Sequence, residues 1–357
     1  MRIVEKLLYG IGGLLALILL FIALCNHNPD IAVKIGERLK KPDETIETNV
    51  PEEGQAGNFV IKTTVTQGEQ PAAESPDSDD DDAQKNLKIP PKVAALTGYI
   101  PIKSTGTEVT QAKADEILET LGKGETGEKL TFDEEFYPYY AILNDTQKAL
   151  YRQLYANADA MQKNFSPVTD ITATDLKNAF TAVVNDHPEL FWVDTAYKYK
   201  YAPLGPVADI TLVFNVTAND IDGSKSKFED AAKLILDKTY GFYTDYDKER
   251  EAHDALIASV RYDANAPMNQ SAYSALVYGR TVCAGYARAL QYVLQQLDIP
   301  CYYVTGYAGE NHAWNIVKLE DGQYYNVDST WDDTNPNTYD YFNCSDAEYA
   351  GNHIRKD

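Results

Sequence analysis

An amphipathic helix followed by a β-hairpin is the pattern that most limits how this chain can fold. Apolar side chains recur at helical spacing after Cys283, and Pro300 ends the helix soon after Asp298. Alternating apolar and polar residues then predict two strands, at 312–319 and 323–331. A helix followed by a β-hairpin, after further helices and strands upstream, predicts an α+β fold.

The length of the turn decides which face of the hairpin each residue occupies. The loop 320–322 separates the two alternating runs, and Gly322 suits the left-handed position of a three-residue loop. With that loop, His312 faces Thr330, and Asp328 becomes its diagonal neighbour on the same face. A two-residue turn would instead put Asp328 on the opposite face. The register of the hairpin thus tests whether these two side chains can meet.

Cys283, His312 and Asp328 follow one another in an order that suits acyl transfer through a thioester. Cys283 opens its helix, where unpaired N–H groups and the helix dipole favour an anion, and its own N–H can serve an oxyanion. Each residue alone has a structural explanation, as a small buried thiol, a hydrogen-bonded histidine or a strand-end carboxylate. Their order, spacing and context together favour a catalytic triad.

The same region resembles the transglutaminase-like superfamily of papain-related cysteine enzymes, particularly its bacterial surface-anchored members. The resemblance rests on EAHD at 251–254 with VRYD at 260–263, SAY at 271–273 with VCAGYA at 282–287, GENHAWN at 309–315, and YYNVDSTWDD at 324–333. It implies a papain/transglutaminase-like core, in which the nucleophile lies at the N-terminus of a helix packed on an antiparallel β-sheet. It also implies that Cys283 is the nucleophile, His312 the general base and acid, and Asp328 the residue that orients the imidazole. Ala284 departs from the tryptophan of animal transglutaminases, so the second oxyanion donor is not identified.

The resemblance and the three residues together predict an enzyme that acts on protein or peptide amides. The Cys283 thiolate would attack a carboxamide or peptide carbonyl, and water would release the acid, as in a cysteine protease or amidase. A lysine amine as acceptor would instead make the enzyme a protein-glutamine transamidase. A different alternative is an inert cell-surface module that binds peptide or cell-wall polymer. As substrate-binding candidates we take three aromatic residues, Tyr273, Trp314 and Trp331.

The amino terminus predicts where this chemistry takes place. Residues 7–25 form an uninterrupted run of apolar residues and glycine, about 28 Å long as a helix and sufficient to span a bilayer. We predict that residues 1–25 form an uncleaved, single-pass membrane anchor and that the catalytic domain is extracytoplasmic. A cleaved signal peptide is the alternative.

An acidic segment follows the predicted anchor. Residues 42–86 carry twelve acidic side chains against two lysines, and so hold ten of the 22 excess negative charges of the chain. Such a segment cannot bury a core, so we predict a solvated linker over 26–95. Its charge argues against a nucleic-acid partner. The predicted partners are therefore the membrane and a protein or peptide substrate, with a substrate attached to the cell wall as one possibility.

The rest of the chain is predicted to form an α/β accessory region, 96–245, and a transglutaminase-like catalytic domain, 246–357. Expected helices lie at 145–162, 174–185, 228–239 and 246–259, with strands at 191–201 and 209–216. Four cysteines are too few for a disulfide framework, although a Cys301–Cys344 bridge is conceivable. Five scattered histidines predict no metal site, and we expect no cofactor.

Overall fold

A computed structural model of the protein describes residues 84, 87–91, 93, 98–203 and 205–356, which all belong to one compact unit. The predicted anchor at 1–25 and most of the predicted linker lie outside these residues, so both stay predictions, as do the domain boundaries. Within the described ranges, none of the helices combines the length and the apolar character needed to cross a membrane.

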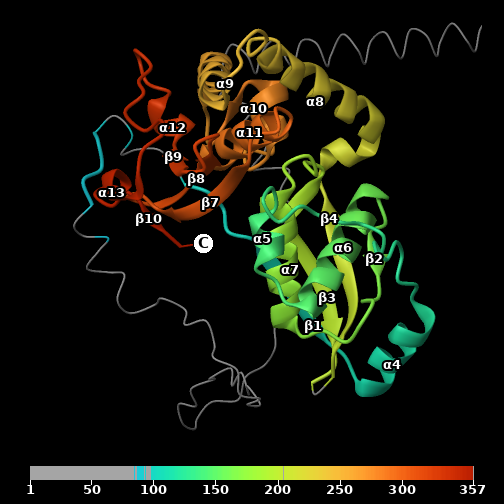
Figure 1. The fold of residues 1–357 in the computed structure, drawn as a ribbon. Helices are drawn as coiled ribbons and strands as arrows, with labels where there is room; N and C mark the ends of the chain where they lie inside the picture. The colour runs from blue at the N-terminus through green and yellow to red at the C-terminus, as the bar shows by residue number, and fades with distance from the viewer. Residues whose placement is uncertain (1–83, 85–86, 92, 94–97, 204, 357) are drawn as a thin grey trace, which may run out of the picture. The chain divides into compact units, whose positions relative to one another are not determined.

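The first of two four-stranded sheets lies in the middle of the chain and has the strand order β1-β3-β4-β2 (Figure 1). Its strands are β1 (Lys103–Glu108), β2 (Asn164–Phe165), β3 (Val193–Tyr201) and β4 (Val207–Phe214). The pairing of β3 with β4 is antiparallel, whereas β1 joins β3 in parallel. The accompanying helices are α4 (Gln111–Thr120), α5 (Pro138–Ala141), α6 (Asp145–Asp159) and α7 (Ala173–Asp186). Capping boxes start both α6 and α7, which explains why these two predicted helices begin where they do.

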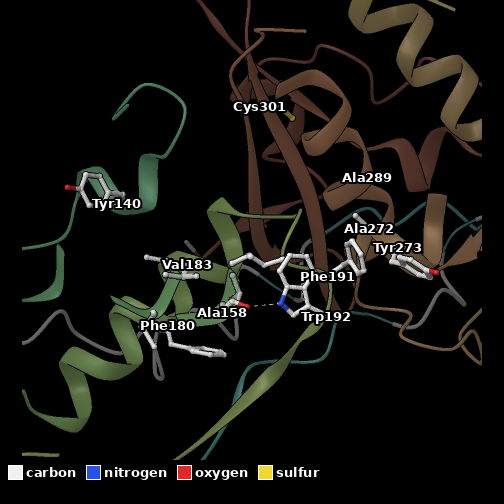
Figure 2. Packing of buried hydrophobic residues seen from close by; sticks show 14 of the residues in the cluster. Tyr140, Ala158, Phe180, Val183, Phe191, Trp192, Ala272, Tyr273, Ala289 and Cys301 are labelled. Carbon is white, nitrogen blue, oxygen red and sulfur yellow. Dashed lines mark hydrogen bonds between the residues drawn. The ribbon is translucent and has the colours of Figure 1, made fainter. Parts of the chain in front are cut away.

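A cluster of buried aliphatic and aromatic residues forms the core of this region and continues to α10 (Ala272–Tyr278), α11 (Cys283–Gln295) and β7 (Cys301–Tyr307) (Figure 2). Phe180 and Val183 project from α7, and Phe191 and Trp192 precede β3. The buried indole N–H of Trp192 donates a hydrogen bond of 2.9 Å to the carbonyl of Ala158 on α6, so this large side chain leaves no unpaired donor in the core.

The next helices lead to the candidate nucleophile. They are the short 3₁₀ helix η1 (Val216–Asp220), α8 (Ile221–Leu236), α9 (Asp245–Ser259), α10 (Ala272–Tyr278) and α11 (Cys283–Gln295). Between them, β5 (Arg261–Tyr262) and β6 (Arg280–Thr281) form a parallel ribbon. The six predicted helices and strands of the middle region are thus confirmed with shifted ends. The strand β1 was missed, because its six residues are all exposed and show no apolar alternation.

The second sheet has the strand order β10-β7-β8-β9 and lies under α11. Its strands are β7 (Cys301–Tyr307), β8 (Asn311–Lys318), β9 (Tyr324–Val327) and β10 (Ile354–Arg355). In the β8–β9 hairpin, Asn315 pairs with Val327 and Lys318 with Tyr324, which is the register predicted for a three-residue loop. Gly322 has a φ of 76°, the left-handed conformation that this loop requires.

The second strand of the hairpin is shorter than the predicted run 323–331. It ends at Val327, and the short helix α12 (Ser329–Asp332) comes next; α13 (Asp346–Tyr349) lies nearer the chain end. The cause is Asp328, whose carboxylate accepts the backbone N–H groups of Thr330 and Trp331 and so caps a helix where continued alternation predicted a strand. His312 therefore does not face Thr330. Its ladder partner is Gly306 on β7.

The cysteines are reduced in the part of the chain that the structure describes. Cys301 is fully buried at the start of β7, and Cys344 is partly exposed. The conceivable Cys301–Cys344 bridge is therefore absent. Burial raises the pKa of both thiols, that of Cys344 to about 11, and neighbouring carboxylates contribute to the rise.

Asn315 joins α11 to the second sheet, and its replacement should loosen that contact. Its buried amide donates to the carbonyl of Ala287 on α11 at 2.9 Å and to that of Tyr302 on β7 at 3.3 Å. We expect Asn315→Ala to lower the free energy of unfolding by roughly 1–3 kcal/mol, because a buried carbonyl loses its donor. Urea unfolding measures the loss. Asn219 is exposed, so Asn219→Ala is the control and should change the free energy of unfolding by less than about 0.5 kcal/mol. An equal effect in both variants would contradict the stabilising role of the Asn315 hydrogen bonds.

Candidate active site

Cys283 lies at the first residue of α11, as predicted. The helix is preceded by Val282, whose apolar side chain supplies no cap, so this position provides no side-chain acceptor for the first N–H groups of the helix. The thiol is 0% exposed and belongs to a small apolar cluster that also contains Ala284, Tyr303 and Ala313. The partial positive charge at a helix N-terminus favours negative charge near this end of α11.

His312 lies near the start of β8 and bridges the other two candidates. Its Nε2 is 2.7 Å from Oδ2 of Asp328, and the ring is also hydrogen-bonded to Cys283. Because Nε2 is used by the carboxylate, Nδ1 is the nitrogen that meets the sulfur. The fold thus brings together the three residues that the sequence singled out as a nucleophile, a base and an orienting acid.

The charges of the site support an imidazolium beside the sulfur. Burial by itself would lower the pKa of His312, but the negative charges and hydrogen bonds of Asp328 and Cys283 outweigh burial and raise it to about 10. Burial likewise opposes ionisation of Asp328, yet His312 and a second histidine keep the pKa of this carboxyl well below its usual range. An ionised carboxylate next to a protonated imidazole is therefore the stable state at neutral pH.

Asp328 accepts four hydrogen bonds with its two oxygens. Oδ1 accepts the backbone N–H groups of Thr330 at 3.0 Å and Trp331 at 3.2 Å. Oδ2 lies 2.7 Å from His312 and 3.2 Å from Nε2 of His353. The side chain is fully buried, so these donors replace water and also fix the direction of the carboxylate.

His353 is the residue of the site that sequence reasoning missed. It precedes β10, which pairs with β7, and this pairing carries a residue near the chain end to the back of Asp328. Burial, together with the charge of His312, lowers the pKa of His353 despite the hydrogen bond to Asp328. A lone histidine outside any motif gave no sequence signal.

A second histidine–aspartate pair holds α12, the helix that Asp328 caps. Nε2 of His253 on α9 is 3.3 Å from Oδ2 of Asp332, and both side chains are fully buried. Oδ1 of Asp332 accepts the backbone N–H of Tyr341 at 3.1 Å and the hydroxyl of Thr338 at 3.0 Å. The EAHD stretch thus contributes a structural contact behind the site.

The three aromatic candidates for substrate binding lie in different places. Tyr273 is 3% exposed and packs against Phe191 in the core, with ring centroids 4.7 Å apart (Figure 2). Trp314 and Trp331 are each 2% exposed, with ring centroids 6.2 Å and 5.5 Å from that of His312. The two tryptophans therefore enclose the imidazole, and substrate contact by any of the three stays a prediction.

The two imidazoles and the carboxylate between them also resemble a metal-ligand set. The candidate ligand atoms of His312, Asp328 and His353 lie within 4.8 Å of one another. The carboxylate, however, is hydrogen-bonded directly to both rings, so the donors point at each other instead of at a common centre. This arrangement fits a proton network better than a cation site.

A variant pair can separate donation by His353 from simple packing. His353 also packs on Trp331, with centroids 4.4 Å apart. We expect His353→Phe, which keeps a ring, to slow alkylation of Cys283 at pH 6.5 about tenfold, because a hydrogen bond to a charged group contributes roughly 1.5–3 kcal/mol. His353→Gln, which keeps a donor at the same reach, should stay within about twofold. If His353→Gln were alkylated more slowly than His353→Phe, packing of the ring and not the hydrogen bond would be the contribution of His353.

The raised pKa of His312 predicts how stability depends on pH. The folded value of about 10 exceeds the unfolded value of 6.5, so the stabilisation is complete below pH 6.5 and is lost as the pH rises through 10. Between pH 6.5 and 9.5 the free energy of unfolding should therefore fall further in the wild type than in His312→Gln, by on the order of a few kcal/mol. Urea unfolding at several pH values measures both slopes. Equal slopes would mean that the imidazole is not charged in the folded protein.

Comparison with known proteins agrees with this geometry. Residues 233–329, which include Cys283, His312 and Asp328, match the family model of the transglutaminase-like superfamily. Similar solved structures include a protein of Cytophaga hutchinsonii described as a "putative cysteine protease" (22% identity, 35% of this chain, 51% of that one, TM-score 0.26). A second is a TGase, with 11% identity over 63% of this chain and 59% of that one and a TM-score of 0.28. A third is the periplasmic domain of TgpA from Pseudomonas aeruginosa, with 16% identity over 36% of this chain and 56% of that one and a TM-score of 0.24. The chain thus spans between half and three fifths of each of these proteins.

No curated protein matches the chain. The family model and the α+β arrangement of α11 on the β7–β9 sheet nevertheless agree with the expectation drawn from the motifs. Residues 233–329 of the chain are thus similar to the transglutaminase-like superfamily, as the motifs of this stretch led us to expect.

Proposed function

We propose that this protein is a thiol-dependent acyl-transfer enzyme that hydrolyses protein or peptide amides. The observation that carries the proposal is the position of His312, which is hydrogen-bonded to Asp328 at 2.7 Å and also to Cys283. Nucleophile, base and orienting acid are thus linked in the order that thioester chemistry needs. The family match supports the same class of reaction.

In the proposed mechanism, the Cys283 thiolate attacks the carbonyl carbon of an amide. The His312 imidazolium then gives its Nδ1 proton to the departing amine, which leaves an acyl thioester on the sulfur. Water attacks that thioester, neutral His312 accepts one of its protons, and the thioester C–S bond breaks to release the acid and to restore the Cys283 thiolate beside the His312 imidazolium. Asp328 keeps a proton on Nε2 throughout, so that Nδ1 always faces the reacting atoms.

The location and partners form a further part of the proposal. The apolar run at 7–25 and the acidic segment at 42–86 support a membrane-anchored enzyme with an extracytoplasmic catalytic domain on a solvated tether. Its substrates would then be proteins or peptides at the cell surface. An inert binding module would have no use for a buried cysteine, histidine and aspartate held in mutual hydrogen bonds.

The test compares Cys283 alkylation by iodoacetamide in the wild type and in His312→Ala, with the site of labelling located by mass spectrometry. We expect the wild-type rate to change little between pH 6.5 and 8, because an imidazolium beside the sulfur supports the thiolate over this range. His312→Ala should be at least tenfold slower at pH 6.5 and should speed up with pH, as a cysteine in an unstructured peptide does. Rates that are indifferent to His312 would exclude the triad.

The acceptor is then identified with a peptide amide substrate and a fluorescent primary amine. Release of the acid without incorporation of the amine is the expected result and indicates hydrolysis. Stable incorporation of the amine into the acyl product would make the enzyme a transamidase. Both products should disappear in Cys283→Ser.

A further inference from the structure

The candidate catalytic residues are closed off from solvent, in part by another segment of the same chain. Cys283 is 0% exposed and His312 only 4%. Tyr99, which precedes the first strand, packs against the apolar cluster that contains Cys283 and Ala284. A thiol without exposed surface cannot reach a peptide carbonyl, so covering groups must move before a substrate can react.

Residues 98–102 contact the enzyme next to His312 as an extended peptide would. The N–H of Tyr99 donates to the carbonyl of Asn311, the residue directly before His312, at 3.0 Å. The N–H of Ile100 donates to Oε1 of Gln270 in the loop before α10, at 2.8 Å. Two successive backbone donors are thus paired with two acceptors of the candidate catalytic domain, which is how an enzyme binds a peptide main chain.

The carbonyl of Asn311 belongs to an open strand edge. The neighbouring carbonyl, that of Glu310, accepts the N–H of Ala308, so the carbonyl of Asn311 points away from β7. On that other side, the described pairing of β9 with β8 begins only at Asn315 and Val327. The edge beside His312 is therefore available to a backbone from elsewhere, and Tyr99 occupies it.

Gly98 is needed for this close approach. A Cβ atom at this position would lie 1.6 Å from the carbonyl oxygen of Asn311, a distance that no pair of atoms tolerates. Any side chain at residue 98 must therefore displace the segment from the edge of β8. The requirement gives a single substitution that should unseat the segment without changing the catalytic residues.

The segment lies at the surface. Ile100 is 45% exposed, and an open pocket of about 260 Å³ lies beside residues 99–102, next to Thr305 on β7 and Arg288 on α11. Tyr99 and Ile102 are partly buried where they pack against apolar clusters. From Lys103 onward, pairing of β1 with β3 anchors the chain, so the segment can leave the site while the first sheet stays folded.

We propose that the edge of β8 and Gln270 form a binding site for an extended peptide backbone, and that residues 98–102 occupy this site as an internal, substrate-like inhibitor. The inference rests on the proposed acyl-transfer function for the identity of the external ligand. The enzyme is latent in the conformation described here. A peptide substrate reaches Cys283 by displacing residues 98–102 from the carbonyl of Asn311 and the amide of Gln270.

The test measures the absolute rate of Cys283 alkylation at pH 7.5 in the full-length chain. Gly98→Ala should react at least tenfold faster than the wild type, because the segment no longer covers the thiol. Gly122→Ala is the matched control and should react at the wild-type rate, since an added Cβ there meets nothing within 4 Å. A Gly98→Ala rate equal to that of the wild type would overturn the proposal.

A second variant and a peptide keep the test independent of any folding defect. Gln270→Ala removes the acceptor of the Ile100 N–H, together with the hydrogen bond that Gln270 donates to the neighbouring Asn269, and should give a smaller increase in rate in the same direction. A capped peptide with the sequence of residues 98–103, Gly-Tyr-Ile-Pro-Ile-Lys, should protect Cys283 again when added to Gly98→Ala. Failure of the peptide to protect at millimolar concentration would count against a peptide-binding site.

The outcome for the segment can be separated from the outcome for the triad. Covering by the segment scales the alkylation rates of the wild type and of His312→Ala by the same factor, so their ratio reports the triad alone. Faster labelling in Gly98→Ala that is indifferent to His312 would support the inhibitor segment and exclude the acyl-transfer function. Labelling that depends on His312 but is unchanged by Gly98→Ala would support the acyl-transfer function and overturn the inhibitor segment.

Discussion

The carboxylate of Asp328 is the interaction on which the site depends. One oxygen accepts two N–H groups of α12, and the other lies within hydrogen-bonding distance of two imidazoles. The same side chain therefore ends β9, starts the helix behind the site, orients His312 and receives His353. Because a buried carboxylate without partners is costly, these contacts must form together. The fold of the last third of the chain and the arrangement of Cys283, His312 and Asp328 thus both depend on satisfying this buried carboxylate.

The sequence was most informative where turn chemistry or periodicity allows only a few local conformations. The loop before Gln323 could be closed by two or three residues, and Gly322 in a three-residue loop set the register that is observed. The apolar stripe after Cys283 likewise placed that residue at the start of a helix. Both features follow from periodicity and turn chemistry, so they are readable without knowledge of the tertiary fold.

Features that depend on contacts distant in sequence could not be predicted in this way. Apolar alternation continues beyond Val327, but a capping carboxylate overrides it, and the need for that carboxylate comes from two histidines elsewhere in the chain. His353 reaches the site only because β10 pairs with β7. The contact of Tyr99 with Asn311 joins residues more than two hundred positions apart and carries no local signal. Each is a tertiary interaction that decides among locally acceptable conformations.

The charges explain why water exclusion and reactivity go together in this site. With an ionised Asp328, an imidazolium at His312 and the proposed thiolate at Cys283, the site carries one net negative charge in a region without exposed side-chain surface. His353 lies 3.2 Å from the same carboxylate and is a further hydrogen-bonding partner of it. Attraction between the thiolate and the imidazolium is stronger in this low-dielectric setting than in water. In the proposal, a peptide that replaces residues 98–102 on β8 excludes water as the segment does. Exclusion of water also removes the hydration of each ion, so the hydrogen bonds of Asp328 to His312 and His353 must replace that hydration.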